Sequence, residues 1–413
     1  MARKAKTGQK PFTSFQKKVL LALASVVGLR MLGLFLVLPV FTLYGLQFTH
    51  SRFLVGFAFG SYGLTMALLQ IPLGRLSDRI GRRKVLLLGM TLFSLGSFVC
   101  AVPDLFPSSM QIGVLIVGRL VQGGGAIVSV AFAAVADHIQ PERRSTAMAV
   151  LGIPIGAAFV IGVIGGPIVA GIFGTSSLFW ITGVLGIGTD LLTANYLPDA
   201  PPTGPAPAPL GEILRTKKLL ALDTGGFLMN FFMSTFFFYF PLIVTSRYHM
   251  NMAHYYELLL PMVFVSGITM FAFTQGADRG LARPLAAIAF LVFLPSAILL
   301  FRPQFLGLDP TDLAAILLGG TLFYIGFTGL EPILPSLVSK CGPENAQGSA
   351  LGVYNSTQFL GSFVGGSVAG LFAHVSADTG MMATLMIASL VGCVLMLAVR
   401  IPKKAAVEHP AHI

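Results

Sequence analysis

Charge is scarce in this chain: only 10% of its 413 residues are Asp, Glu, Lys or Arg, whereas 55% are apolar. Soluble globular proteins carry about a quarter of their residues as charges, so most of this chain cannot face water. The formal net charge of +11 does not indicate a nucleic-acid partner, because the basic residues are divided among the segments between apolar runs. The composition therefore predicts an all-α membrane protein.

Reactive and metal-binding groups are also few. The three cysteines, Cys100, Cys341 and Cys393, are far apart and lack a CxxC spacing, so we interpret them as packing residues. No histidine falls clearly inside an apolar run, and there is no nucleophile elbow and no phosphate-binding loop. We therefore expect no enzymatic activity, no metal and no cofactor.

Twelve apolar runs are long enough to cross a bilayer, each needing about 20 residues. The expected spans are 19–46, 53–74, 84–102, 111–134, 147–173 and 179–197, followed by 219–244, 255–277, 284–301, 312–338, 349–372 and 381–399. Between the two sets lies the linker 198–218, which begins with the Pro/Ala-rich stretch 198–209; this stretch predicts a semi-rigid spacer that resists helix formation. The expected units are a basic N-terminus (1–18), two six-helix bundles (19–197 and 219–399) joined by that linker, and a tail (400–413).

The distribution of basic residues predicts the orientation of the chain. Of the 27 Lys and Arg residues, 22 lie in the termini and in alternating loops on one side, and the opposite loops hold only Arg52, Arg247 and Arg302. Basic residues are retained on the cytoplasmic side, so both termini are expected to be cytoplasmic. The basic segment from Arg3 to Lys18 is expected to contact anionic lipid headgroups.

Two patterns recur about 200 residues apart and indicate an internal repeat. Gly162-x-x-x-Gly166 followed by Ala170-Gly171 returns as Gly361-x-x-x-Gly365 followed by Ala369-Gly370. The group Asp78, Arg79 and Arg83 returns as Asp278, Arg279 and Arg283. Parallel repeats of this kind build many transporters, in which substrate binds between the two halves near the middle of the membrane.

The segment 74–84, GRLSDRIGRRK, follows the second span. Gly74 and Gly81 permit close approach and a tight turn. An unpaired carboxylate at Asp78 would be costly at this depth, so we expect it to pair with Arg82 and with the positive end of a helix from the other half. The positive-inside rule alone explains the arginines but not Asp78.

Two arginines lie deep inside spans. Arg30 falls about eleven residues into the first span, and Arg119 falls about eight residues, or roughly 12 Å, into the fourth, where Gln122 follows it. A charge at this depth indicates a functional site by default. A cavity lined by both arginines would favour anionic, zwitterionic or neutral substrates over lipophilic cations. The alternative, that one arginine pairs internally and never meets substrate, is equally open.

These segments carry a resemblance to a known family. GRLSDRIGRRK (74–84), RLVQGGGA (119–126) and GVIGGPIVAG (162–171) resemble three motifs of the major facilitator superfamily, the last being typical of its twelve-helix drug:proton antiporter branch. In that third motif Gly162 and Gly166 would pack against another helix, Pro167 would bend the span, and Gly171 would follow, while Ala170 replaces a common glycine. Segments 30–40, 330–340 and 352–366 are similar to the YajR type of exporter within this branch.

The resemblance implies a fold of two pseudo-symmetric six-helix bundles and a location in a bacterial inner membrane. It also implies a charge relay among Asp78, Arg82 and Asp137, with Arg79 and Arg83 nearby, that docks near Gly348 and Ser349 when the cavity faces outward. Exporters of the YajR type carry an extra soluble C-terminal domain, whose function we expect to be absent because this chain ends at Ile413.

Proton coupling requires an acid that can gain and lose a proton, and the spans hold three candidates. Asp190 is the deepest, Glu331 lies nearer the cytoplasmic end and could instead brace the relay, and Asp223 lies so close to a span end that a snorkelling role is favoured. Polar contacts to substrate are expected from Asn230 in an aromatic run and from the face formed by Tyr354, Asn355 and Gln358.

The favoured hypothesis is a monomeric, proton-coupled exporter of small organic molecules that works by alternating access and has no nucleic-acid partner. An importer or facilitator of a small organic anion, motivated by Arg30 and Arg119, and an exporter of siderophores or lipids are alternatives within the same fold. A non-transporting membrane sensor is disfavoured, because the longest loop is the short Pro-rich linker.

Overall fold

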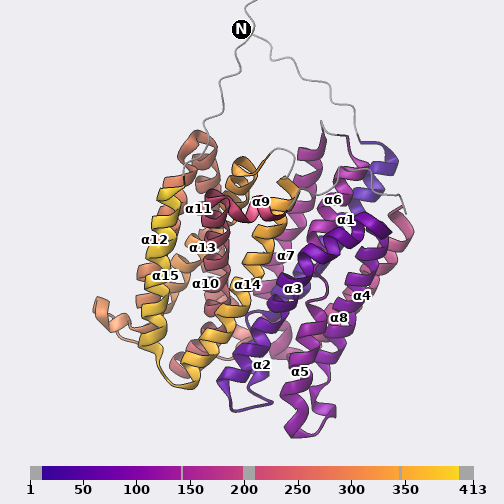
Figure 1. Ribbon diagram of the computed structural model, residues 1–413. Coiled ribbons are helices and arrows are strands. Elements are labelled where there is room, and N and C mark those ends of the chain that lie inside the picture. The colour runs from indigo at the N-terminus through magenta and orange to yellow at the C-terminus, as the bar shows by residue number, and fades with distance from the viewer. Residues whose placement is uncertain (1–11, 141–142, 199–209, 344–346, 400–413) are drawn as a thin grey trace, which may run out of the picture.

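The computed structural model describes residues 12–140, 143–198, 210–343 and 347–399, and within these ranges the regular structure is helical, with no strand. Helices α1 to α8 form one bundle and α10 to α15 form a second bundle beside it (Figure 1). The helices are α1 (Ser14–Val37), α2 (Phe41–Gly45), α3 (Arg52–Ile80), α4 (Arg82–Ala101), α5 (Ser108–Gln122), α6 (Val128–His138), α7 (Arg144–Phe173), α8 (Ser176–Tyr196), α9 (Leu210–Arg215), α10 (Lys217–Tyr248), α11 (Tyr256–Gly276), α12 (Ala282–Phe301), α13 (Leu313–Cys341), α14 (Gln347–His374) and α15 (Asp378–Ala398).

Helix occupies each of the twelve expected spans, and the all-α membrane fold is confirmed. Among the described residues, nine helical segments are long and apolar enough to cross a membrane, one of which is the 50-residue stretch Met252–Phe301 that contains both α11 and α12. The expected fourth span is divided between α5 and α6, and α14 is not among the nine. Four glycines in the second half of α14, Gly361, Gly365, Gly366 and Gly370, pack against other helices.

Three expected boundaries are corrected. The first span ends at Val37 and a short second helix starts at Phe41, because Pro39 between them has no backbone N–H to donate. The fourth span breaks between Gln122 and Val128, where three consecutive glycines favour leaving the helix. The expected linker ends before residue 218, because α10 already starts at Lys217, and α9 lies inside the linker after the last proline, Pro209.

The start of the chain is also more helical than expected. The Thr13 hydroxyl accepts from the Gln16 backbone N–H, the Gln16 side chain accepts from the Thr13 N–H, and this capping box starts α1 at Ser14. Most of the basic segment that is expected to contact lipid, together with the tail 400–413, lies outside the described residues. We call the end of the molecule at which α1 starts the terminal end, and the opposite one, which holds α2, the far end (Figure 1).

The internal repeat predicted from the sequence corresponds to equivalent helix contacts. A Cβ built on Gly166 of α7 would lie 2.1 Å from the carbonyl oxygen of Leu36 in α1, and one on its repeat equivalent, Gly365 of α14, would lie 2.6 Å from that of Phe231 in α10. No side chain fits at either place, so both glycines bring helix backbones into contact. Arg83 donates to the carbonyl of Ala194 near the end of α8, and Arg283 donates to that of Leu397 near the end of α15.

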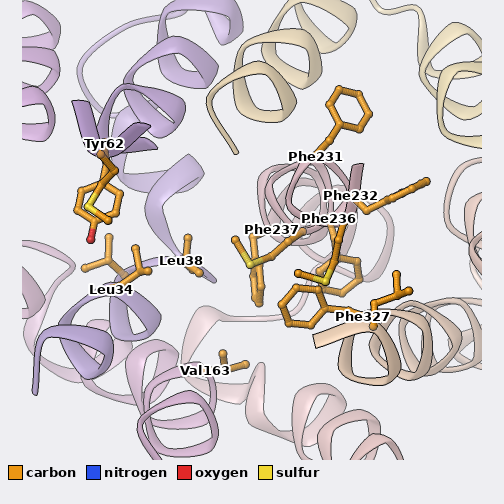
Figure 2. Packing of buried hydrophobic residues seen from close by; sticks show 14 of the residues in the cluster. Leu34, Leu38, Tyr62, Val163, Phe231, Phe232, Phe236, Phe237 and Phe327 are labelled. Carbon is orange, nitrogen blue, oxygen red and sulfur yellow. The ribbon is translucent and has the colours of Figure 1, made fainter. Parts of the chain in front are cut away.

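The aromatic run of α10 is a packing element. Phe231, Phe232, Phe236 and Phe237 are all at most 5% exposed. They surround α10 in Figure 2, in which Leu34, Leu38 and Tyr62 of the other bundle lie across from them. Phe232 stacks on Phe293 with ring centroids 4.1 Å apart, and Phe236 stacks on Phe323 at 4.0 Å. The run therefore stabilises the core of the second bundle.

The two bundles touch through backbone near the far end. A Cβ built on Gly56 of α3 would lie 2.4 Å from the carbonyl oxygen of Gly366 in α14, and one on Gly60 would lie 2.5 Å from that of Phe363. Arg52, at the start of α3, donates to the carbonyl of Ala373 at 3.1 Å. We call this contact between α3 and α14 the glycine seam.

A second contact between the bundles lies at the end of α7. A Cβ built on Gly171 would meet the Cβ of Ala253 at 2.5 Å, in the 3₁₀ turn Met252–His254 that joins α10 to α11. With the glycine seam, this contact closes the space between the bundles at the far end.

Candidate functional site

The predicted charge relay is assembled at the terminal end of the first bundle. Arg82, only 8% exposed, forms an ion pair with Asp78, and its Nε donates to Asp137 Oδ2 at 2.9 Å. Its Nη1 also donates to the hydroxyl of Ser77 at 2.6 Å. One guanidinium joins the end of α3, the start of α4 and the end of α6. A conformational change at any of these three places therefore alters the contacts at the other two.

Two glycines in this segment have different roles. Gly81 has a φ of 100°, and it makes the sharp corner between α3 and α4 that a side chain would strain. Gly74, by contrast, is not in close contact: the nearest heavy atom to a Cβ built there is the Ser129 hydroxyl, 3.9 Å away. Gly81 therefore makes the tight turn that was expected, and close approach at Gly74 is not observed.

The other two arginines of the segment stand outside the relay. Arg79 is exposed, and Arg83 donates to the carbonyl of Ala194 at 2.5 Å. The start of α14 does not pack on the relay in this conformation, since Gly348 is exposed and no heavy atom lies within 4 Å of a Cβ built on it. An undocked α14 is consistent with a protein that is closed at its far end.

Both deep arginines are sealed inside the first bundle, which corrects the expectation that they line a cavity. Arg30 is 0% exposed and Arg119 is 2% exposed. Arg30 donates from Nε to the carbonyl of Gly125 and from Nη2 to the Tyr62 hydroxyl, both at 2.7 Å. The Arg119 guanidinium lies 4.7 Å above the Tyr62 ring. Tyr62 is thus a shared partner that the sequence motifs did not reveal.

The break between α5 and α6 supplies a carbonyl acceptor for Arg30. The last carbonyls of a helix carry partial negative charge and lack a partner within the helix. Arg119 lies in the last turn of α5, and Gly125, which accepts from Arg30, lies in the break itself. Gln122 accepts from Arg119 at 2.5 Å and donates to the Ser97 hydroxyl at 2.8 Å, so it positions the arginine and does not face a cavity.

The third motif packs helices together. A Cβ on Gly162 would lie 2.6 Å from the Cβ of Phe35, which together with Gly166 fixes α7 against α1. Helix α7 runs without interruption through Pro167. Among its glycines, Gly171 is the one that contacts the other bundle, through Ala253.

Asp190 lies away from the space between the bundles. Its Oδ2 accepts from the Thr91 hydroxyl at 3.0 Å, which joins α8 to α4. Neighbouring positions on α8 and α4 are exposed large aliphatic residues, Ile187 and Leu191 on one helix and Leu88 on the other. Such side chains face lipid in a membrane protein, so the structure does not bring Asp190 together with the other candidate residues.

Asp223 is buried, contrary to the expectation that it snorkels. It is 4% exposed, and its Oδ1 has no hydrogen-bond partner among the described residues. One turn along α10, a Cβ built on Gly226 would lie 2.4 Å from the ring of Tyr354 in α14, so this glycine makes room for the tyrosine next to Asp223. Asn230 follows one more turn along the same face of α10 and is 8% exposed.

Glu331 faces the space between the bundles. It lies two turns after Tyr324 and one turn after Phe327 on α13, and both of those rings contact Phe159 of α7 in the other bundle, with centroids 6.0 and 6.2 Å apart. Side chains at this spacing share one face of a helix. Glu331 itself is exposed, although it shares this face of α13 with the two rings.

Tyr354 connects the two acids. Asp223 and Glu331 both lie close enough to interact electrostatically with it. Its hydroxyl accepts from Gln358 Nε2 at 3.2 Å, and Asn355 beside it is half-buried. Three helices of the second bundle therefore bring together Asp223, Glu331, Tyr354 and Gln358, and we call this group the acidic cluster.

Comparison with known proteins places the chain in a family of transporters. The model of the Major Facilitator Superfamily matches residues 23–366. The chain is 32% identical over 366 residues to the inner membrane transport protein YajR of Escherichia coli strain K12. The aligned region covers 87% of this chain and 78% of that protein. An uncharacterized transporter, BU466, of Buchnera aphidicola is 30% identical over 365 residues, covering 84% and 88%.

A solved structure supports the same fold. The crystal structure of a D-xylose-proton symporter superposes with a TM-score of 0.72 at 15% identity, covering 93% of this chain and 98% of that one.

Proposed function

We propose, from the premise that this chain belongs to the major facilitator superfamily of membrane transporters, that it is a proton-coupled exporter of small organic molecules. Transport across a membrane, without enzymatic chemistry, follows from the family. Coupling to protons and the outward direction are the proposed part.

The observation that carries proton coupling is the isolated carboxylate of Asp223. A buried carboxyl group is stable when it is neutral or paired with a cation, and costly otherwise. Asp223 has no ion pair in the described residues, and its Oδ1 has no hydrogen-bond donor. We therefore assign the transported proton to Asp223, with Glu331 as the group that exchanges it with water on the open side.

Alternating access is supported by the contrast between the two ends of the molecule. At the far end the bundles meet backbone to backbone in the glycine seam, whereas at the terminal end Gly348 of α14 is unpacked and Glu331 is exposed. Rocking that separates Gly60 from Phe363 would open the far end. Rocking would also bring the start of α14 toward the relay of Asp78, Arg82 and Asp137, which we propose as the lock of the outward-facing state.

Import of a small organic anion is the second candidate, and the structure weakens the argument for it. That argument rested on Arg30 and Arg119, whose exposed fractions of 0% and 2% leave neither guanidinium available to a ligand in this conformation. Export of siderophores or lipids has no specific support in the described residues. We place the protein as a monomer in a bacterial inner membrane, with both termini in the cytoplasm.

Proton movement in proteoliposomes tests this function. The purified chain is reconstituted with a pH-sensitive dye inside, and one cationic, one anionic and one neutral organic dye are added in turn. We expect at least one to drive proton movement, which Asp223→Asn abolishes. Asp190→Asn, which changes an acid away from the bundle interface, is the matched control and should leave the movement intact. The coupling would be refuted if Asp223→Asn transported the dye at the rate of the parent chain and this rate did not depend on a pH gradient.

A further inference from the structure

A cavity lies inside the second bundle, among α10, α12, α13 and α15. Its walls are mostly carbon and include the stacked pairs Phe232–Phe293 and Phe236–Phe323. Every residue that lines it is at most 7% exposed, so the cavity belongs to the interior of the bundle. Along α10 it begins at Phe232, about 14 Å beyond Asp223. The cavity is therefore separate from the acidic cluster.

Three hydroxyl groups interrupt this apolar wall. Thr235 and Tyr239 lie one turn apart on α10, and Ser296 lies on α12. The Ser296 hydroxyl donates to the carbonyl of Gly319 at 2.8 Å, which leaves its oxygen able to accept. The hydroxyl oxygens of Thr235 and Tyr239 are buried and have no hydrogen-bond partner among the described residues.

Other buried threonines of this chain satisfy their hydroxyl groups within their own helix. Thr182, Thr193 and Thr328 each donate to the carbonyl four residues earlier. Thr235 could reach the carbonyl of Phe231 in the same way, but it does not make this bond. A buried hydroxyl without a partner is costly in an apolar interior. We therefore expect the Thr235 hydroxyl to bond to a molecule in the cavity.

The cavity has the size of a water site. About 20 Å³ of it is open to the centre of a water-sized sphere. One water needs roughly 10–15 Å³ by this measure, and a buried water typically makes about three hydrogen bonds. Thr235, Tyr239 and Ser296 offer three bonding groups from two helices.

We propose that this cavity binds a structural water molecule that joins α10 to α12. The water donates to the Ser296 oxygen and to one of the two α10 hydroxyls, and it accepts from the other. Tyr239 also lies close enough to interact electrostatically with Arg52, which takes part in the glycine seam, and with Asp378 at the start of α15. The water therefore fixes a tyrosine that lies near the closed end of the molecule.

X-ray footprinting of the purified full chain tests the site. A short X-ray pulse converts water into hydroxyl radicals, and these oxidise a ring beside a bound water even where bulk solvent does not reach. We expect Phe236, which lines the cavity, to be oxidised faster than Phe237, which is also buried but lies outside the cavity wall. A double variant, Thr235→Val with Tyr239→Phe, removes both α10 hydroxyls and should lose this excess. Thr328→Val, which removes a hydroxyl elsewhere in the same bundle, is the matched control and should keep it.

Two footprinting results would overturn the proposal. Oxidation of Phe236 at the rate of Phe237 would mean that the cavity is dry or holds an apolar molecule. An unchanged excess in the double variant would mean that the α10 hydroxyls do not hold the water.

The single variant Thr235→Val provides a second measurement, because valine has the shape of threonine without its hydroxyl. We expect a lower Tm, since a hydrogen bond to the water is lost. An unchanged or higher Tm would show that the hydroxyl is unpaired in the parent chain, and it would overturn the proposal. Both measurements are made without transport, so they stand apart from the proposed function.

Discussion

Replacing Gly60 with valine should force open the far end of the molecule. A Cβ at this position would lie 2.5 Å from the carbonyl oxygen and 2.9 Å from the Cα of Phe363, and real Cβ atoms essentially never come within 3.0 Å of such atoms. Both atoms belong to the backbone of α14, which cannot rotate away as a side chain can. The helices must separate by at least several tenths of an ångström, and the two γ carbons of valine require more.

The cost falls on one conformation only. Overpacking a close contact costs about 1–3 kcal/mol. Gly60 packs against α14 only while the far end is closed, so the same energy shifts the equilibrium toward the far-open conformation about 5- to 150-fold. The first bundle itself is not strained, because the groups closest to the added Cβ all belong to Phe363 in the second bundle.

Distance measurements between two spin labels would detect this shift. Leu105 and Phe305 are 81% and 65% exposed, lie in far-end loops of different bundles, and are suitable labelling positions. We expect Gly60→Val to increase the population at longer distances, and Gly188→Val, where an added Cβ meets no heavy atom within 4 Å, to leave it unchanged. A folded Gly60→Val protein with the parent distance distribution would refute the reasoning. Gly60→Ala supplies a milder variant if valine prevents folding.

Two further substitutions test the buried charges. Asp137→Asn replaces the charged acceptor of Arg82 with a neutral one and should lower stability by about 1–3 kcal/mol, measured as a lower Tm in detergent, whereas the exposed loop change Asp104→Asn should not. An unchanged Tm in Asp137→Asn would show that the relay does not stabilise this conformation. Arg30→Met leaves the Gly125 carbonyl and the Tyr62 hydroxyl without their donor, at about 1–3 kcal/mol each, and should lower Tm far more than Arg79→Met at an exposed position. A stable Arg30→Met protein that fails to bind substrate would instead place Arg30 in the binding site.

Local sequence information was sufficient for the pair of Asp78 and Arg82 and for the helix contacts within each bundle, whereas Asp137 was expected only from the family resemblance. Asp78 and Arg82 are four residues apart across a corner that needs the positive φ of Gly81, and the small-residue spacing of Gly162 and Gly166 predicts close helix packing. The break at Gly123 to Gly125 also has a local signal, which is three consecutive glycines. These features depend on the chemistry of neighbouring residues in the chain.

The sequence by itself determined that this chain is a membrane protein of two related helical bundles, because hydropathy and repeat spacing are properties of the chain alone. Only the tertiary structure decided which embedded charges meet the space between the bundles. Arg30 and Arg119 have the depth expected of site residues, but the rotation of their helices turns them toward Tyr62 and the carbonyls of a broken helix, away from any ligand. Glu331 faces that space because its helix turns the same side toward Phe159 of the other bundle. Depth follows from counting residues, whereas the direction of a side chain depends on how its helix packs against all the others.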